Sequence, residues 1–271
     1  MQRRAVIIAN ESLPHHASFG GSFAKGLARC GWRVEVSTSY KPADLIVMWG
    51  VRNKVAIGQQ QAAGGEVCIL ERGYLGDRFT MTSVSFGGGL NGRGRFVIPP
   101  GVGIERFAEL DLIMWPWADF STRRGPAVIM GQVLGDQSVK HVNIGNWYRT
   151  AAAGCIAAGY DVRFRPHPGA RGVVGQCHGM KEARGSLAEV LDNAGLVVTF
   201  NSNSGVDAVL AGRATVAMDP GSMVWDIAAH DIVPTDRLAF PDRSAWAARL
   251  AWCQYSREEM ESGFCAEAVG L

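Results

Sequence analysis

The sequence predicts an α/β protein built from two Rossmann-like domains. Short apolar runs typical of buried strands alternate with segments whose apolar residues recur at helical spacing. This alternation is typical of a parallel sheet with helices on its faces. A polar stretch at residues 119–126 (DFSTRRGP) separates two groups of such runs and is typical of a linker. We therefore expect one domain over residues 1–122 and a second over residues 123–243.

The composition is that of an ordinary globular protein. The 271 residues are 47% hydrophobic and 19% charged, which is enough chain for one large or two small domains. The 34 glycines suit the many tight turns that connect strands to helices. The formal net charge of +2 provides no strong overall attraction to nucleic acid, so any DNA contact has to be local.

Several motifs that would indicate other classes are missing from the sequence. The six cysteines show no CxxC and no zinc-ligand spacing, so we expect reduced thiols and a cytoplasmic location. The N-terminal apolar run is too short for a signal peptide, and no run approaches the ~20 apolar residues of a membrane span, so we expect no membrane association. The sequence has no GxxxxGK[ST] and no DxD, so we expect neither a P-loop enzyme nor a bound metal, and no cofactor.

The first domain begins with alternating elements. The expected strands are residues 4–9, 34–36, 44–49 and 66–70, and the expected helices start after residue 21 and at residue 55. Between the first strand and the first helix we expect a loop over residues 15–22, at the carboxyl end of the strand. His16 in this loop is a candidate base or ligand contact. The alternative is that His15 and His16 are ordinary loop residues.

An acidic residue follows the strand at residues 66–70. Glu71 is next to Arg72, and Asp77 and Arg78 come shortly after. A carboxylate beside arginines stays ionised, which suits a base that takes a proton from an acceptor hydroxyl. Glu71, and after it Asp77, are therefore candidate catalytic residues. The alternative for Glu71 is an ion pair with Arg72 or Arg78 that shapes the loop.

The stretch at residues 86–96 (FGGGLNGRGRF) is rich in glycine and cannot form a core, so we expect a loop. Asn91, Arg93 and Arg95 lie in it, and with Arg72 and Arg78 they are candidate acceptor-binding residues. Such a basic, flexible loop suits a phosphate-bearing acceptor, including a DNA backbone. A solvated loop without a ligand is the alternative.

The second domain repeats the alternation. The expected strands are residues 127–134, 161–164, 196–200 and 214–218, and the expected helices are residues 147–158, 186–195 and 204–212. Residues 219–231 predict a loop with a short helix, in which Asp219 or Trp225 is a candidate contact for a base or sugar. Residues 244–255 and 257–264 predict two C-terminal helices.

Polar residues follow the strands of the second domain, at the ends where parallel sheets bind their ligands. They are Gln132 and Asp136 after the first strand, Arg165 and His167 at the second, and Ser202, Asn203, Ser204, Gly205 and Asp207 after the third. We expect Ser204 to cap the next helix, Gly205 to admit a ligand to the backbone, and the helix N-terminus to attract phosphate. Arg165 and His167 would complete a nucleotide-phosphate site. A capped helix with no ligand is the alternative.

The HP dipeptide at His167 and the serine-rich strand end that leads into SGVDAVLAG resemble the donor-binding half of GT-B glycosyltransferases. The resemblance is to the group of capsule-polysaccharide Kdo transferases and bacterial sialyltransferase-like proteins. The segments LIVMWGVRNK, VCILERGYLGDRF and VIMGQVLGDQSV stand in the same order as in that group, so the resemblance spans residues 43–226. It implies a cleft between two Rossmann-like domains, and a C-terminal helix within residues 244–271 that crosses back to the first domain. The second domain would bind a UDP- or CMP-linked sugar.

The sequence departs from that group at one point. The group has two acidic residues before a glycine, and this sequence has Glu71–Arg72 there. Arginine thus replaces the residue usually credited with base or nucleophile chemistry, and a non-catalytic nucleotide-sugar-binding module is one reading of that change. An epimerase or phosphotransferase of the same architecture is another alternative.

The segment ERGYLGDRF followed by GLNGRG also resembles phage-encoded glycosyltransferases that modify DNA bases. We therefore expect a metal-independent glycosyltransferase in the cytoplasm of a phage host. Its expected acceptor is a 5-hydroxymethylated pyrimidine in double-stranded phage DNA. Sugar transfer to a capsule or other surface glycan is the alternative.

Overall fold

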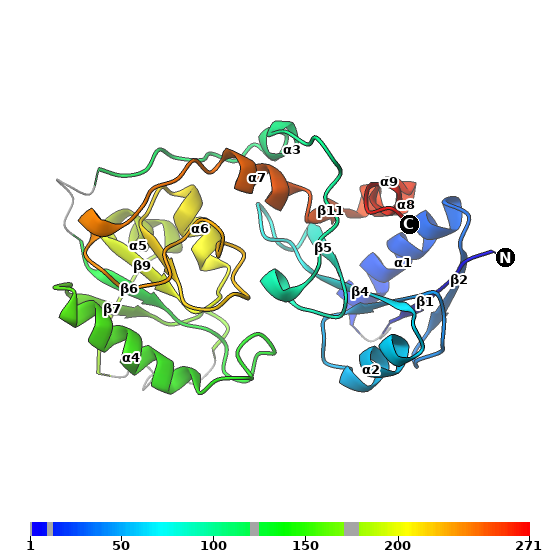
Figure 1. The fold of residues 1–271 in the computed structure, drawn as a ribbon, viewed down its shortest axis with the longest axis horizontal. Coiled ribbons are helices and arrows are strands. Elements are labelled where there is room, and N and C mark those ends of the chain that lie inside the picture. The colour runs from blue at the N-terminus through cyan, green and yellow to red at the C-terminus, as the bar shows by residue number, and fades with distance from the viewer. Residues whose placement is uncertain (1, 10–12, 120–124, 171–178) are drawn as a thin grey trace. The chain divides into compact units, whose positions relative to one another are not determined.

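The computed structural model describes residues 2–9, 13–119, 125–170 and 179–271. The chain forms two compact units, each with its own sheet and helices (Figure 1). Unit 1 consists of Met1–Leu112 together with Ser244–Leu271, and unit 2 consists of Ile113–Arg243. The C-terminal segment is thus part of unit 1. Most of the linker expected at residues 119–126 lies outside the described residues.

Unit 1 contains a six-stranded sheet in the order β11-β5-β4-β3-β1-β2. Its strands are β1 (Arg4–Ile8), β2 (Arg33–Ser37), β3 (Leu45–Trp49), β4 (Glu66–Arg72), β5 (Met81–Phe86) and β11 (Gln254–Ser256). The first four are parallel, as the apolar runs predict. Strands β5 and β11 are antiparallel additions that the sequence pattern did not predict. Polar residues interrupt both segments, so neither forms an apolar run.

The helices of unit 1 differ from the expected ones. They are α1 (Pro14–Arg29), α2 (Lys54–Ala62), α3 (Glu105–Ala108), α7 (Ser244–Ala251), α8 (Arg257–Ser262) and α9 (Phe264–Ala268), with a 3₁₀ turn at Asn91–Arg93. Of these, α3 and α9 were not predicted as separate helices. The expected loop at residues 15–22 is wrong, because α1 already begins at Pro14, whose ring fixes a helical φ. The expected helix at residues 244–255 is also wrong at its end, because the chain leaves the helix after Ala251 and enters β11.

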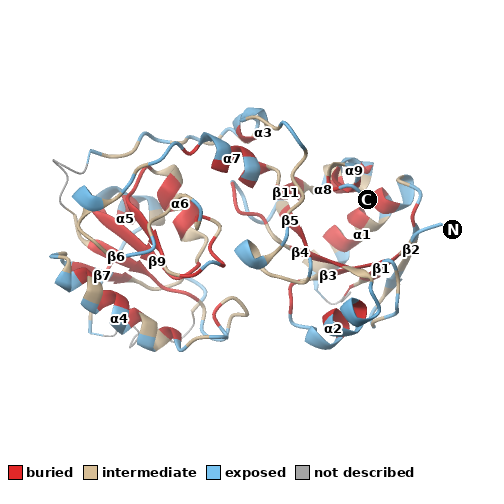
Figure 2. Cartoon of the chain, viewed as in Figure 1, coloured by how far each residue is buried: buried red, intermediate tan, exposed pale blue. Residues whose placement is uncertain are grey.

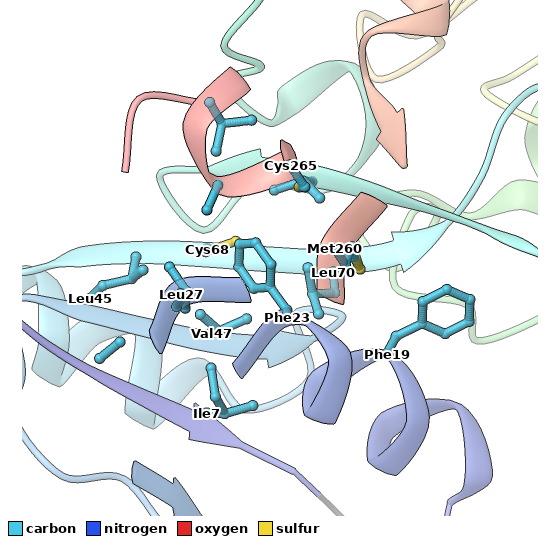
Figure 3. Packing of buried hydrophobic residues seen from close by; sticks show 14 of the residues in the cluster. Ile7, Phe19, Phe23, Leu27, Leu45, Val47, Cys68, Leu70, Met260 and Cys265 are labelled. Atoms are coloured by element: carbon cyan, nitrogen blue, oxygen red, sulfur yellow. The ribbon is translucent and has the colours of Figure 1, made fainter. Parts of the chain in front are cut away.

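The core of unit 1 joins both ends of the chain. Phe23 and Leu27 of α1 pack over the sheet, beside Val47 and Leu70, and Met260 from the C-terminal segment packs in the same cluster (Figure 3). A second cluster covers the opposite face of the sheet under α2. Helices therefore cover both faces of this sheet, as expected for a Rossmann-like unit.

Unit 2 contains a five-stranded parallel sheet in the order β10-β9-β6-β7-β8. Its strands are β6 (Ala127–Met130), β7 (Val162–Arg165), β8 (Lys181–Glu182), β9 (Leu196–Thr199) and β10 (Thr215–Ala217), and its helices are α4 (Ile144–Ala157), α5 (Leu187–Asn193), α6 (Ser204–Leu210) and a 3₁₀ turn at Thr235–Arg237. Helix α4 covers one face of this sheet and α5 and α6 the other (Figure 1). The strands between them are buried (Figure 2).

Two expectations for unit 2 need correction. Strand β6 ends at Met130 rather than at residue 134, because the chain turns away from the sheet after Gly131. The short helix expected within residues 219–231 is absent, and turns form there instead. Ala229 makes an isolated parallel bridge to Val216 of β10.

No described helix is both long enough and apolar enough to cross a membrane. Among the five cysteines of the described segments, Cys68, Cys155, Cys253 and Cys265 are buried and all five are free thiols. Burial raises the pKa of Cys155 to about 12, so this thiol stays protonated at neutral pH. Cys177 lies outside the described residues.

Candidate functional site

The strands of unit 2 bring their following loops together at the carboxyl edge of the sheet, because all five strands are parallel. The ends of β6 and β7 approach closely at Gly131. A Cβ atom there would lie 2.8 Å from the carbonyl oxygen of Arg165, and the Gly131 amide donates a hydrogen bond of 2.8 Å to the same oxygen. The backbone segments that immediately precede Gln132 and His167 are therefore in contact.

A buried polar network joins three of these strand ends. Gln132 Nε2 donates to Asn201 Oδ1 (2.6 Å), and the backbone amide of Asn201 donates to Gln132 Oε1 (3.2 Å). Asn201 Nδ2 also donates to Asp219 Oδ2 (2.8 Å) and to the Ser138 carbonyl oxygen (2.9 Å). Gln132, Asn201 and Asp219 are 7%, 5% and 3% exposed. Because these buried groups are hydrogen-bonded to one another, the network holds the loops at this edge in one conformation.

Asp136 is engaged within its own loop. Its Oδ1 accepts hydrogen bonds from the Ser138 amide (2.8 Å) and hydroxyl (2.7 Å). Both residues are half-buried. Asp136 thus shapes the loop after β6, whose other end contributes the Ser138 carbonyl to Asn201.

The two basic residues at the end of β7 are both half-buried. Arg165 Nη1 donates to the Gly185 carbonyl oxygen (2.8 Å), which ties it to the loop before α5. His167 Nδ1 accepts from the Gly169 amide (2.9 Å). Because Nδ1 is the acceptor, Nε2 carries the ring proton and is the donor of this imidazole.

The serine-rich segment after β9 differs from the expected phosphate cradle. Helix α6 begins at Ser204 itself, and Asn203 precedes it without a side-chain cap, so the expected N-cap role of Ser204 is wrong. The first amides of the helix donate within the segment: Ser204 to Ser202 Oγ (3.3 Å), Gly205 to the Ser202 carbonyl (3.0 Å) and Val206 to the Asn203 carbonyl (2.8 Å). This segment therefore offers hydroxyls, paired through Ser204 Oγ and Ser202 Oγ at 3.0 Å.

Close packing accounts for the glycine at position 205, in place of the expected approach of a ligand to the backbone. It is buried, and a Cβ atom would lie 3.1 Å from both Thr199 Cγ2 and Val224 Cγ2. Glycine here lets α6 lie directly on β9. Asp207 is half-buried in the first turn of the same helix.

The sequence analysis did not identify every residue of this edge. His141, in the loop before α4, has its Nε2 3.4 Å from Asp219 Oδ1, and its ring lies 5.7 Å from that of Phe200. Asp219 Oδ2 accepts from the Gly221 amide as well (3.0 Å). The only sequence signal for His141 is its position in a loop that follows a strand of the parallel sheet.

In unit 1, Glu71 is the penultimate residue of β4 rather than the first residue after it. Its Oε1 accepts from the Arg72 amide (3.1 Å), and its Oε2 lies at Gly50, where a Cβ atom would be 3.5 Å away. The half-buried carboxylate thus lies at the carboxyl edge of the sheet, between the ends of β3 and β4.

A row of rings lies at the start of α1 and beside these strand ends. The rings of His15 and His16 stack on Trp49 at 6.1 and 5.6 Å, His15 lies 6.2 Å from Phe79, and the Arg72 guanidinium lies 4.1 Å over Phe79. We call these five residues the aromatic row. Burial, and then the charges of His15 and Arg52, lower the pKa of His16, so its imidazole is neutral at pH 7.

Asp77 lies in a tight turn after β4. Its Oδ1 accepts from the Phe79 amide (2.9 Å), and its carbonyl oxygen accepts from the Thr80 hydroxyl (2.9 Å). Arg78 Nε donates to the Gly73 carbonyl (2.9 Å). Asp77 therefore orders the turn that carries Phe79 into the aromatic row.

The structure does not gather the expected acceptor-binding arginines. Arg72 and Arg78 lie at and just after the carboxyl end of β4. Arg95 forms an ion pair with Glu66 at the other end of that strand, six residues or about 20 Å away at ~3.3 Å per residue. In the loop between β5 and Arg95, Asn91 Oδ1 accepts from the Tyr74 hydroxyl (3.3 Å), and Arg93 is exposed. Within the described segments no three His, Cys, Asp or Glu residues are arranged to hold a metal ion.

No protein-family model matches this sequence, and no curated protein does. The solved structures that are similar over the whole chain include two Kdo transferase structures. One is Thermosulfurimonas dismutans KpsC, β-Kdo 2,4-transferase, with a TM-score of 0.62 and 14% identity over 100% of this chain and 99% of that one. The other is the β-Kdo 2,7-transferase of the same KpsC, with a TM-score of 0.54 and 12% identity over 98% and 99%. The expected fold is confirmed: this is a mixed α/β chain with two largely parallel sheets, similar in fold to GT-B glycosyltransferases.

Proposed function

We propose that this protein is a glycosyltransferase that moves a sugar from a nucleotide-sugar donor to a hydroxyl acceptor. The observation that carries the proposal is the full-length likeness to a Kdo transferase at a TM-score of 0.62. The carboxyl edge of the unit 2 sheet also supports it, because polar side chains from three strand ends meet there, at the edge where parallel sheets bind their ligands.

The donor phosphate is proposed to lie on unit 2, between the end of β7 and the serine segment. Arg165 and the Nε2–H of His167 supply positive charge and a donor, and the hydroxyls of Ser202 and Ser204 supply further hydrogen bonds. Gln132 stabilises this edge of the sheet through its hydrogen bond to Asn201. As the glycosidic bond to the phosphate breaks, His167 and Arg165 would stabilise the negative charge of the leaving group.

The acceptor hydroxyl is proposed to be deprotonated by Glu71. Its carboxylate is partly exposed at a strand end and is next to Gly50, which leaves room beside it. Neutral His16 is the second candidate base, and Asp77 is the third, although its carboxylate is occupied in a turn. No metal is proposed in this reaction, since Arg165 provides positive charge and the Nε2–H of His167 provides a hydrogen bond at the place where a cation would otherwise act.

For the acceptor, the geometry favours a glycan hydroxyl over a hydroxymethylated pyrimidine in DNA. The aromatic row provides flat ring faces near Glu71, which suit the apolar face of a sugar ring. A DNA backbone would instead need clustered cations, and Arg72 and Arg95 lie at opposite ends of β4. A base inside a duplex would also have to be flipped out, at a few kcal/mol.

The test begins with thermal shifts for a panel of CMP-, UDP- and other nucleotide sugars, because a ligand of the native state raises the melting temperature. The stabilising donors are then incubated with hydroxymethylated duplex DNA and, separately, with acidic and neutral oligosaccharides, with and without EDTA. Mass spectrometry of the acceptors should show one added sugar on an oligosaccharide, with or without EDTA.

Each other result has a distinct meaning. Mass gain on the DNA nucleosides would restore the DNA acceptor. Arg93→Ala with Arg95→Ala should then reduce the slope of log affinity against log salt concentration by about 0.9 per lost phosphate contact. Donor binding without transfer or hydrolysis would indicate a binding module. No shift with any nucleotide sugar would overturn the proposed function.

A further inference from the structure

The pair formed by His141 and Asp219 is not used in the reaction described above. Asp219 is 3% exposed, and its carboxylate accepts hydrogen bonds from Asn201 Nδ2 (2.8 Å) and the Gly221 amide (3.0 Å). His141 Nε2 is 3.4 Å from the remaining oxygen. A buried carboxylate with donors at both oxygens is a fixed anchor, and the imidazole is its outermost partner.

The imidazole of His141 is held in place but remains accessible. The side chain is 44% exposed, while its ring is in contact with that of Phe200, 5.7 Å away. Nε2 faces the Asp219 carboxylate, so Nδ1 lies on the side of the ring that is turned away from Asp219. An orientation of this kind is common where an imidazole must present one defined nitrogen to a partner.

The charge distribution along the sheet edge indicates which part of a nucleotide this imidazole meets. In the strand order β10-β9-β6-β7, the cationic Arg165 and the donor Nε2–H of His167 are at the β7 end. The β10 end carries the Asp219 carboxylate, which disfavours a phosphate and favours groups that donate hydrogen bonds. A nucleotide bound along this edge thus has its phosphate near β7 and its hydroxyl-bearing ribose near β10.

We propose that His141 reads the ribose of the donor nucleotide, with Nδ1 in a hydrogen bond to a 2′- or 3′-hydroxyl and with Asp219 as the positioning residue. This inference rests on the proposed function, because it assumes that a nucleotide occupies this edge. It adds a specificity: the protein discriminates ribonucleotides from deoxyribonucleotides.

The test measures the affinities of CMP and UMP and of their 2′-deoxy and 3′-deoxy forms by isothermal titration calorimetry. The wild-type protein should bind one deoxy form roughly 3- to 10-fold more weakly than the ribonucleotide, as for the loss of one hydrogen bond. His141→Ala should bind both forms with equal affinity, close to that of the wild-type protein for the deoxy form. The control is His230→Ala, which removes an exposed imidazole of the same unit that bonds the Trp225 carbonyl, and should keep the discrimination.

Asp219 is tested without relying on a fragile core variant. Long-range ¹⁵N–¹H spectra of the wild-type protein should show the His141 ring protonated at Nε2, and a ring protonated at Nδ1 would contradict the positioning role of Asp219.

Discrimination that survives in His141→Ala, or wild-type affinities that are equal for both forms, would overturn the ribose contact while leaving the transferase proposal intact. Failure of every nucleotide to bind would overturn both.

Discussion

Asparagine 201 shows how a single residue organises the proposed donor edge. Its amide nitrogen, side-chain oxygen and side-chain nitrogen connect the loops after β6, β9 and β10. A buried side chain that is hydrogen-bonded to two other loops keeps those loops and its own from moving independently. The residues proposed to bind the donor, such as His167 and Ser204, are half-buried, whereas Asn201 is buried.

The first residue-scale prediction concerns His167. His167→Ala removes the Nε2–H donor and should weaken nucleotide binding by about 10- to 100-fold, corresponding to ~1.5–3 kcal/mol for a hydrogen bond to a charged group. Ser204→Ala should have a smaller effect in the same direction. The control is Arg163→Ala, which removes an exposed arginine of the same strand that is paired with Asp161. Equal nucleotide affinity in all three variants would place the donor elsewhere.

The second concerns Glu71. Glu71→Gln keeps the shape of the side chain and removes the base, so turnover should fall at least ~100-fold while donor affinity stays nearly unchanged. Glu66→Gln is a matched control at the other end of the same strand, where the carboxylate pairs with Arg95. Near-normal turnover of Glu71→Gln would assign the base role to His16 or Asp77.

The third concerns pH. Burial lowers the pKa of His16 from 6.5, so its folded-state pKa lies below its unfolded value. The unfolded chain then binds more protons, and the stability contributed by neutral His16 is present above about pH 6.5 and lost as the pH falls below it. His16→Asn should lose less of its melting temperature between about pH 7.5 and pH 5.5 than the wild-type protein does. Identical pH dependence in both proteins would contradict the assignment.

At the scale of elements, the contact between α1 and α8 shows how closely the two ends of the chain pack. A Cβ atom at Gly26 of α1 would lie 1.9 Å from the carbonyl oxygen of Met260 in α8. Lys25 and Glu261 form an ion pair across the same contact at 2.8 Å. Backbone can approach backbone at this point only because residue 26 has no side chain.

Gly26→Ala should therefore destabilise unit 1 by roughly 1–3 kcal/mol, because α8 has to shift. Gly21→Ala is the matched control in the same helix, where a Cβ atom meets nothing within 4 Å. That variant should be neutral or more stable by up to ~1 kcal/mol, from the higher helix propensity of alanine. Urea unfolding of the two variants checks this, and equal stabilities would contradict the packing of α8 on α1.

At the scale of the whole molecule, the C-terminal segment completes unit 1 after the chain has formed unit 2. Gln254 is fully buried, and its Oε1 accepts from the amides of Tyr74 and Leu75 at 2.7 and 2.9 Å. Arg106 donates to both carboxylate oxygens of Glu259, which ties α3 to the same segment. The turn that follows Glu71 thus depends on residues from the far end of the sequence.

Removal of residues 244–271 should unfold unit 1 and spare unit 2. The truncated protein would lose Tyr255, Met260 and Cys265 from its core, and β5 would keep β4 but lose β11, one of its two neighbours. Hydrogen exchange should show protection lost in β1, β3 and β4 but retained in β6 and β9, with nucleotide binding preserved. Native-like protection of β3 in the truncated protein would contradict this account.

The local elements could be read from the sequence alone. The run LIVMW predicts a buried central strand, and β3 is one. The segment SLAEVLDNAG predicts a helix, and α5 begins there with Ser186 and Glu189 in a capping box. These signals succeed because apolar period and capping chemistry act between residues a few positions apart. The same reasoning placed polar residues at the strand ends that meet at one edge of the unit 2 sheet.

The tertiary structure decided what depends on residues far apart in the chain. Gln254 bonds the amide of Tyr74 across 180 positions, and Gln132 bonds Asn201 across 69. The pairing of β5 with β11, the link between His141 and Asp219, and the separation of Arg95 from Arg72 likewise follow from which edges come together. No local pattern encodes such contacts, because their free energy exists only once both partners are packed. The sequence alone therefore determined the elements with a clear apolar pattern, while packing determined the edge strands β5 and β11 and which polar groups share a site.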